Sequence, residues 1–376
     1  MKLKKALLVC LIPAFVISGC GKATTDEAEN TMKQETTAEE SAQDEQETES
    51  TEAETSGEDA DEEAEVSKDL FAMDTYMTLT AYGEHAQEAV DKAAERVEAL
   101  DALLSTGDEN SEIYQLNQSG EATLSEEGGY LVERALELYQ KTDGAFDIAI
   151  YPVMQAWGFP TQEYHVPDDA TLKEKLALAD ASKVNYDKDT RKISFGQDGM
   201  EIDLGGIAKG YTSSQIMQIY QDCGVTSGLV NLGGNVQALG CKTDGSKWRV
   251  AIQSPDDTED YLGILEIENQ AVITSGGYER YFEEDGVTYH HIIDPATGYP
   301  ADSGLISVTI VSDDGTLADG LSTSLFIMGE EKAAQFWREN SDEFETIMET
   351  SDGKLYVTEG IADSLTTDMD VTVIEK

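Results

Sequence analysis

Two periods of apolar and polar residues alternate along this chain, and each predicts a different kind of element. Between residues 86 and 104 the apolar positions recur every three or four residues, which predicts an amphipathic helix. The same spacing predicts helices over 125–139, 168–181, 207–222, 316–328 and 332–339, with a short helical turn at 111–116. Alternating or β-branched runs predict strands over 70–83, 184–195, 228–232, 248–253, 263–267, 270–275, 306–311 and 354–357. Another strand is expected to end at the glycine pair Gly205-Gly206.

The first twenty residues follow neither pattern. Three lysines precede an apolar run over 6–17 that is short for a membrane span. The run ends in Ile17-Ser18-Gly19-Cys20, which resembles the lipobox of bacterial lipoproteins. The resemblance implies a signal peptide over 1–19, lipidation of Cys20 and an extracytoplasmic protein, lipid-anchored to the bacterial cell membrane. An uncleaved N-terminal anchor is the alternative.

Residues 20–66 form a predicted acidic, disordered tether, followed by a folded domain over 67–376. The tether contains no aromatic residue and carries 18 acidic side chains against Lys22 and Lys33. Such a segment cannot bury enough apolar surface to offset its ordering entropy. The whole chain has a net charge of −51, which argues against binding to nucleic acid because phosphate would be repelled.

The cysteines change this interpretation little. Outside the leader only Cys223 and Cys241 remain, and they lack the close spacing of zinc ligands. A disulfide between them is conceivable but disfavoured, because two cysteines do not make a framework.

Candidate chemistry begins with two adjacent histidines, His290 and His291, followed by Ile292, Ile293 and the turn signal Asp294-Pro295. An isolated pair of this kind is usually structural, with satisfied or exposed ring nitrogens. Asp294 is expected to cap the turn rather than to orient His291. His290 is expected to be structural.

Other candidate residues supply oxygen atoms. Gly205 and Gly206 precede a predicted helix, and a helix N-terminus favours an anion, although tight packing would explain the glycines equally well. Asp319 and Thr323 are four residues apart and therefore share a helical face. Hard oxygen ligands suit Mg²⁺ working with substrate phosphates, whereas zinc would require closely spaced His or Cys. The sequence thus favours a phosphate-ester or pyrophosphate site with one Mg²⁺.

Six motifs in order resemble those of the ApbE-type flavin transferases, the FAD:protein FMN transferases. The resemblance covers about residues 70–356 and implies an α+β fold of mixed β-sheets with packed helices, which agrees with the predicted elements. The motifs are Met73-Asp74-Thr75, Asp143-Gly144-Ala145-Phe146-Asp147, Ile202-Asp203-Leu204-Gly205-Gly206-Ile207-Ala208-Lys209-Gly210, Asn231-Leu232-Gly233-Gly234-Asn235, His291-Ile292-Ile293-Asp294-Pro295-Ala296-Thr297-Gly298 and Ala318-Asp319-Gly320-Leu321-Ser322-Thr323.

The resemblance also implies roles for individual positions. His291 matches the catalytic histidine, and the carbonyl of Gly206 with Asp319 and Thr323 matches the Mg²⁺ ligands. Taken alone, Asp147 would be a turn or cap residue. Gly320 departs from the family, whose members often carry alanine or a larger residue there. The positions that match FAD contacts are Met73, Ala145, Phe146, Asp147, Asp203, Lys209 and Ile293.

The implied reaction transfers FMN from FAD to a Ser or Thr hydroxyl of an acceptor protein and releases AMP. The acceptor would be a protein with an FMN-binding domain, such as an Rnf- or Nqr-type subunit or a similar lipoprotein. A base with a pKa near 6 to 7 would assist, which suits an unperturbed His291. Two alternatives remain: a Mg²⁺-dependent FAD pyrophosphatase, and a non-enzymatic flavin-binding lipoprotein.

Overall fold

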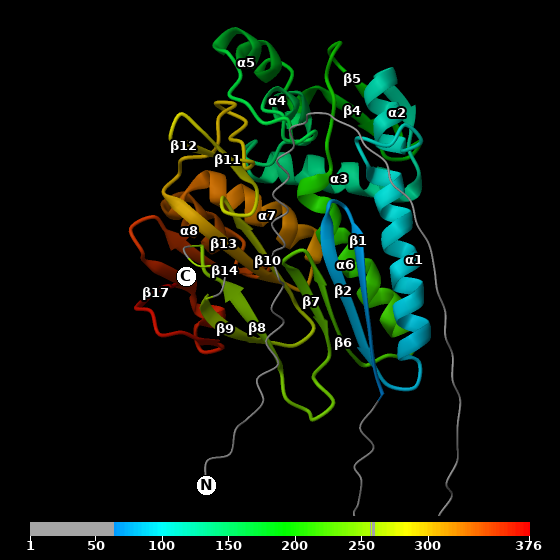
Figure 1. Ribbon diagram of the computed structural model, residues 1–376, viewed down its shortest axis with the longest axis vertical. Coiled ribbons are helices and arrows are strands. Elements are labelled where there is room, and N and C mark those ends of the chain that lie inside the picture. Colours follow the sequence, from blue (N-terminus) through cyan, green and yellow to red (C-terminus); the bar gives the residue numbers. More distant parts are fainter. Residues whose placement is uncertain (1–63, 256, 258–259) are drawn as a thin grey trace, which may run out of the picture. The chain divides into compact units, whose positions relative to one another are not determined.

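A nine-stranded sheet forms the centre of the protein (Figure 1). The computed structural model describes residues 64–255, 257 and 260–376. Neighbouring strands of the sheet run antiparallel, except β15 and β17, which are parallel, so the sheet is mixed. Its order is β1 (Glu65–Ala72), β2 (Thr75–Tyr82), β6 (Ser227–Leu232), β7 (Asn235–Leu239), β10 (Ala271–Gly276), β13 (Leu305–Ser312), β14 (Glu345–Thr350), β15 (Leu355–Thr358) and β17 (Val371–Ile374).

Helices cover one face of this sheet. Alternate residues of a strand point to opposite faces, and Ile273, Ile310 and Met348 join a core with the helices. The amphipathic helix predicted over 86–104 is found with the same bounds and buries its apolar stripe against β1 and β2. The helices are α1 (Ala86–Leu104), α2 (Glu112–Ser119), α3 (Glu126–Lys141), α4 (Tyr151–Ala156), α5 (Asp169–Leu176), α6 (Gly205–Asp222), α7 (Gly315–Met328), α8 (Glu330–Glu339) and α9 (Glu359–Ala362).

Smaller sheets complete the fold. Val272, Val311 and Ile347 point to the other face of the main sheet, where they pack against the sheet of β16 (Leu365–Thr366), β9 (Tyr261–Ile267) and β8 (Trp248–Gln253). A second sheet contains β3 (Glu121–Thr123), β5 (Lys192–Phe195) and β4 (Val184–Asp187). A hairpin of β11 (Tyr281–Glu284) and β12 (Val287–His290) ends at the histidine pair. The predicted α+β class with mixed sheets is confirmed.

The structure corrects several predicted elements. The single strand expected over 70–83 is a hairpin, because Met73 and Asp74 both have positive φ (49° and 58°) and turn the chain between β1 and β2. Strand β1 also begins at Glu65, before the predicted start of the domain. The residues directly before Gly205, 200–204, form no strand, and α6 begins at that glycine rather than at residue 207. The helix predicted over 168–181 ends at Leu176, and β14 was not predicted.

Helices α6 and α7 cross at a pair of glycines. A Cβ atom on Gly210 would lie 2.1 Å from the Gly315 carbonyl oxygen and 2.6 Å from Asp319 Cβ. A Cβ on Gly315 would in turn lie 2.7 Å from the Gly210 carbonyl oxygen. Only glycine therefore allows this approach, which brings Asp319 of α7 against the first turns of α6.

The leader, Cys20 and nearly all of the predicted tether lie outside the described residues. Within the described part, no helix is both long and apolar enough to cross a membrane. Cys223 and Cys241 are both free thiols, as the sequence favoured.

Candidate functional site

The N-terminus of α6 forms one wall of the candidate site. Gly205 and Gly206 are exposed, and the preceding Leu204 provides no side-chain cap. Asp203 Oδ1 accepts a hydrogen bond from the Gly205 N–H at 2.8 Å. Burial raises the pKa of the Asp203 carboxyl, and the Arg280 guanidinium partly opposes this shift. An exposed helix N-terminus with a nearby cation is suited to an anionic ligand.

Asp319 is held against the same helix. Its Oδ2 accepts a hydrogen bond from the Gly210 N–H at 2.8 Å, and its Oδ1 accepts one from Asn235 Nδ2 at 3.0 Å. In an α-helix the carbonyl four residues before Gly210 is that of Gly206, so the carboxylate lies at the turn that carries this predicted ligand. Asp319 is buried, which raises the pKa of its carboxyl, while Lys209 acts in the opposite direction.

Thr323 lies one turn beyond Asp319 on α7, as the sequence predicted. Its hydroxyl is 3.3 Å from Ser275 Oγ at the end of β10. The same Ser275 Oγ lies 2.8 Å from Ser322 Oγ. No group of three or more His, Cys, Asp or Glu side chains among the described residues is arranged to hold a metal ion. One carboxylate, a hydroxyl and a carbonyl are nevertheless the kind of incomplete oxygen set that Mg²⁺ uses when substrate phosphates supply other ligands.

His291 is anchored through a single carbonyl group. The Arg280 carbonyl oxygen accepts from the His291 backbone N–H at 3.0 Å and lies 3.2 Å from its Nδ1. A carbonyl only accepts hydrogen bonds, so the neutral ring carries its proton on Nδ1 and has a lone pair on Nε2. Phe159 packs edge-on against the ring, with centroids 6.4 Å apart. This tautomer is the one a general base at Nε2 requires.

The pKa of His291 differs from the sequence-based expectation of 6 to 7. Burial lowers it from 6.5 to about 3, and the charges of Arg280 and Lys209 act in the same direction. Desolvation disfavours the charged imidazolium, and two nearby cations disfavour it further. The ring is therefore neutral throughout the physiological range, with an unprotonated Nε2, and is a weaker base than an unperturbed histidine.

The neighbouring predictions for His290 and Asp294 agree with the structure. His290 Nε2 lies 3.1 Å from the Ala301 carbonyl oxygen, and its Nδ1 accepts from the Ile292 N–H at 3.3 Å, so both nitrogens are occupied. Asp294 Oδ1 accepts from the Ala296 N–H at 2.8 Å and caps the turn. Neither side chain is left available for chemistry.

The predicted flavin-contact residues lie around the α6 N-terminus or in the nearby core. Phe146 is buried beside Gly206, where an added Cβ would lie 3.1 Å from Phe146 Cε2. Met73 Sδ is 3.8 Å from the Thr212 hydroxyl of α6. Ile293 is buried in a hydrophobic cluster that includes Trp157 and Phe159.

Asp147 functions as a cap in this structure, as its local sequence suggested. Ala145, two residues earlier, is partly exposed. Asp147 Oδ1 accepts from the Ala149 N–H at 2.7 Å, and its Oδ2 accepts from the Ala181 N–H at 3.2 Å. Burial nevertheless raises the pKa of this carboxyl to about 6. Asp147 thus fixes the backbone that presents Phe146 to the α6 N-terminus.

Three further residues lie at the site without a sequence-based assignment. Asn235 closes the predicted Asn-Leu-Gly-Gly-Asn motif, so its position was flagged but its contact with Asp319 was not. Glu279 and Arg280 precede β11 and carry no local signal. Glu279 is surrounded by protein atoms, although part of its side chain is exposed to solvent. The surrounding protein raises the pKa of its carboxyl to about 7, and the charge of Lys209 opposes this shift.

The unusual Gly320 has a packing explanation. A Cβ atom there would lie 2.5 Å from Leu138 Cδ1 of α3. The leucine side chain occupies the space that a methyl group would take, so α7 keeps its packing against α3 in spite of the glycine.

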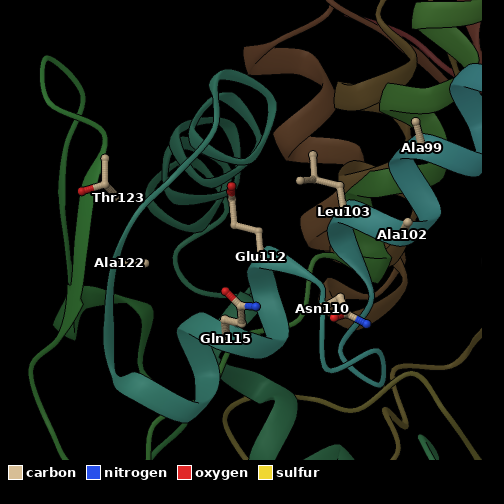
Figure 2. A pocket seen from close by; sticks show the side chains of 8 residues that line it. All are labelled: Ala99, Ala102, Leu103, Asn110, Glu112, Gln115, Ala122 and Thr123. Atoms are coloured by element: carbon tan, nitrogen blue, oxygen red, sulfur yellow. The ribbon is translucent and has the colours of Figure 1, made fainter.

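A separate groove of about 510 Å³ lies between α1, α2 and the β3 segment (Figure 2). It contains none of the predicted site residues. Its acidic residue, Glu112, accepts a hydrogen bond from the Ser125 N–H at 2.8 Å at the start of α3. Glu112 therefore stabilises the start of α3, and nothing in the groove indicates a catalytic role for it.

The fold is α+β, and the site combines a neutral histidine, the pair Asp319 and Thr323, and an exposed helix N-terminus of the kind that suits an anionic ligand. The chain belongs to the ApbE family, whose model matches residues 73–348. It is 35% identical over 262 residues to the FAD:protein FMN transferase of Klebsiella pneumoniae (strain 342), covering 69% of this chain and 81% of the relative. It is 31% identical over 368 residues to the FAD:protein FMN transferase of Salmonella typhimurium (strain LT2), covering 94% and 95%.

Solved structures give the same result. The ApbE protein of Thermotoga maritima superposes with a TM-score of 0.75 at 30% identity, covering 79% of this chain and 98% of that one. The flavin transferase ApbE of Vibrio cholerae superposes with a TM-score of 0.72 at 28% identity, with the same coverage.

Proposed function

We propose that this protein transfers the FMN moiety of FAD to a Ser or Thr hydroxyl of an acceptor flavoprotein and releases AMP. Its relatives along most of the chain are FAD:protein FMN transferases. The observation that supports the chemistry best is a neutral His291 whose Nδ1 is held by the Arg280 carbonyl, which leaves the lone pair on Nε2.

The reaction balances without an additional reagent. The acceptor hydroxyl oxygen forms a bond to the FMN phosphorus of FAD, the pyrophosphate P–O bond breaks, and AMP leaves with the electron pair. The hydroxyl proton passes to His291 Nε2. The Arg280 carbonyl keeps the ring in the tautomer that accepts at this atom.

The donor set around Asp319 fits Mg²⁺. Asp319, Thr323 and the carbonyl of Gly206 would hold the ion, and a bound Mg²⁺ supplies neutralisation and polarisation of the pyrophosphate. Asp319→Ala is expected to abolish transfer with little change in fold, because it removes the charged ligand. Full activity of this variant in EDTA-treated buffer with added Mg²⁺ would refute the assignment.

The decisive experiment mixes the protein with FAD, Mg²⁺ and a purified FMN-binding-domain protein, and detects covalent flavin by fluorescence in a denaturing gel. His291→Ala is expected to slow transfer by about 10²- to 10⁴-fold, the usual range for general acid–base catalysis. His290→Ala, checked for folding, is the control and should lose far less activity.

The same mixture separates the alternative activities. Free FMN and AMP formed without an acceptor would indicate an FAD pyrophosphatase. Bound FAD that is never cleaved would indicate a flavin-binding lipoprotein. The presence of Asp319, Thr323 and His291 argues against the flavin-binding lipoprotein, because a purely binding protein needs no base, and the assay without acceptor decides against or for the pyrophosphatase.

We also propose that the protein acts outside the cytoplasm, anchored by lipid on Cys20, on acceptors such as Rnf- or Nqr-type subunits or lipoproteins with an FMN-binding domain. The support is the Ile17-Ser18-Gly19-Cys20 segment. Cys20→Ser is expected to release the protein from membranes. Mass spectrometry that finds an unmodified Cys20 thiol would contradict this.

A further inference from the structure

We infer that the Arg280 guanidinium binds the pyrophosphate of the substrate and stabilises the phosphoryl group under attack, so that Arg280 is a catalytic residue. The inference rests on the proposed FMN transfer and extends it to a side chain that no sequence motif indicated.

Arg280 differs from the other partly buried arginines of the described residues. Arg96 pairs with Glu127 at 3.2 Å, and Arg134 pairs with Glu137 at 2.8 Å and Asp314 at 3.0 Å. Within the described part of the chain, no carboxylate oxygen lies within 4.0 Å of the Arg280 guanidinium. A partly buried cation without an ion pair is unexpected in a chain with 76 acidic and 25 basic residues, and it suggests that the partner is a ligand.

The contacts of Arg280 hold it in place but leave some of its guanidinium N–H donors without a protein partner among the described residues. Its Nη2 donates to the Phe159 carbonyl oxygen at 2.9 Å. Its own carbonyl accepts from His291 at the backbone N–H and at Nδ1. A guanidinium has five N–H donors in a planar fork, so a phosphate can be bound by the remaining donors without loss of the Phe159 contact.

Electrostatic coupling places Arg280 beside the reacting groups. Its charge lowers the pKa of both Asp203, at the α6 N-terminus, and His291. Lys209 of α6 acts on His291 and Asp319. Both cations therefore act on His291, and each also acts on a carboxylate of the candidate site, Arg280 on Asp203 and Lys209 on Asp319.

The chemistry of the step requires such a group. As the hydroxyl attacks and the P–O bond to AMP breaks, negative charge is spread over phosphate oxygens, and fixed donors that meet this charge lower the barrier. Arginine binds phosphate through two parallel hydrogen bonds, whereas lysine acts as a point charge. Because the same residue anchors His291 through its carbonyl, the phosphate it binds is held near the base.

The test compares Arg280→Gln and Arg280→Lys with Arg191→Gln. Arg191 is a matched control, because its Nε also donates to a main-chain carbonyl, that of Leu124, at 3.1 Å and away from the site. Equilibrium fluorescence titration measures the affinity for FAD and for riboflavin, which lacks both phosphates. Single-turnover gel fluorescence measures FMN transfer from saturating FAD.

We expect Arg280→Gln to lower the affinity for FAD at least tenfold, while the affinity for riboflavin stays within twofold of wild type. The same variant should slow FMN transfer by about 10²- to 10³-fold, as for loss of one transition-state donor. Arg280→Lys should regain most FAD affinity but little of the rate, and Arg191→Gln should match wild type.

Unchanged FAD affinity in folded Arg280→Gln, or an equal loss for riboflavin, would overturn the inference. Should Arg280→Gln fail to fold, Arg280→Lys decides: a wild-type transfer rate overturns the inference, and slow transfer with retained FAD binding supports it. A wild-type protein that binds FAD but transfers no FMN would refute the proposed function, while the FAD and riboflavin titrations would still test phosphate binding by Arg280.

Discussion

Replacing Asn235 by leucine should reveal how the protein holds its predicted metal ligand. Asn235 Nδ2 donates to Asp319 Oδ1 at 3.0 Å, and both side chains are buried, 2% and 6% exposed. Leucine has a similar size but cannot donate. In the variant, Asp319 keeps the Gly210 N–H as a partner on Oδ2 and loses the partner of Oδ1.

The expected magnitude follows from this geometry. A hydrogen bond to a charged group contributes about 1.5–3 kcal/mol, so the metal-free variant should be less stable by that amount. Groups that orient a metal ligand contribute about 10- to 100-fold to metal affinity. The Mg²⁺ concentration for half-maximal FMN transfer should therefore rise about 10- to 100-fold, with a smaller change in the rate at saturating Mg²⁺.

Two measurements test this prediction: the transfer rate as a function of Mg²⁺, and urea unfolding in EDTA. Asn231→Leu is the control, because Asn231 lies in the same hairpin but accepts from the Gly234 N–H at 2.8 Å and does not contact Asp319. A Mg²⁺ requirement within twofold of wild type in Asn235→Leu would refute the reasoning. An equal shift in Asn231→Leu would attribute the effect to the hairpin as a whole.

Three further predictions concern His291 and the glycines Gly210 and Gly320. ¹⁵N NMR should show His291 neutral and protonated on Nδ1 from pH 5 to 8; because its folded pKa of about 3 is below 6.5, its contribution to stability is complete above pH 6.5 and is lost as the pH falls toward 3. Gly210→Ala should lower the urea midpoint by an amount equivalent to about 1–3 kcal/mol, because the new Cβ meets the Gly315 carbonyl at 2.1 Å. Gly320→Ala should leave stability within about 1 kcal/mol of wild type, because the flexible end of Leu138 has to move while the helix gains about 1 kcal/mol in propensity.

The sequence predicted best where one local pattern decides the structure. The apolar spacing of α1 gave its bounds, and the four-residue interval placed Asp319 and Thr323 on one face of α7. Strand β14 was missed because Thr346 and Glu349 are buried there, so an internal strand does not look apolar. Burial of polar groups depends on tertiary partners, which a single sequence does not specify.

The candidate site was predicted only as far as its motifs extended. Asn235 lies in β7, 84 residues before Asp319, and meets it only in the folded protein. Arg280 and His291 adjoin the β11–β12 hairpin, but no motif indicated that the Arg280 carbonyl would anchor the ring. The predicted pKa of His291 was also wrong, because burial lowers it most, and the charges of Arg280 and of Lys209, more than 80 residues away in the chain, lower it further. Electrostatics at a site built from distant segments cannot be deduced from the identity of the residue alone.

The turn at Met73 and Asp74 connects a prediction error to the site. Both residues adopt positive φ without being glycine, a conformation that local preference opposes and that a single predicted strand did not include. A tertiary contact supports it: Met73 Sδ lies 3.8 Å from the Thr212 hydroxyl of α6. The charge of Asp74 raises the pKa of the Asp203 carboxyl, so the turn lies near the residue that precedes α6. Strain that the surrounding structure has to maintain is concentrated at binding sites, and the place where the local pattern failed is therefore where the hairpin meets the proposed flavin site.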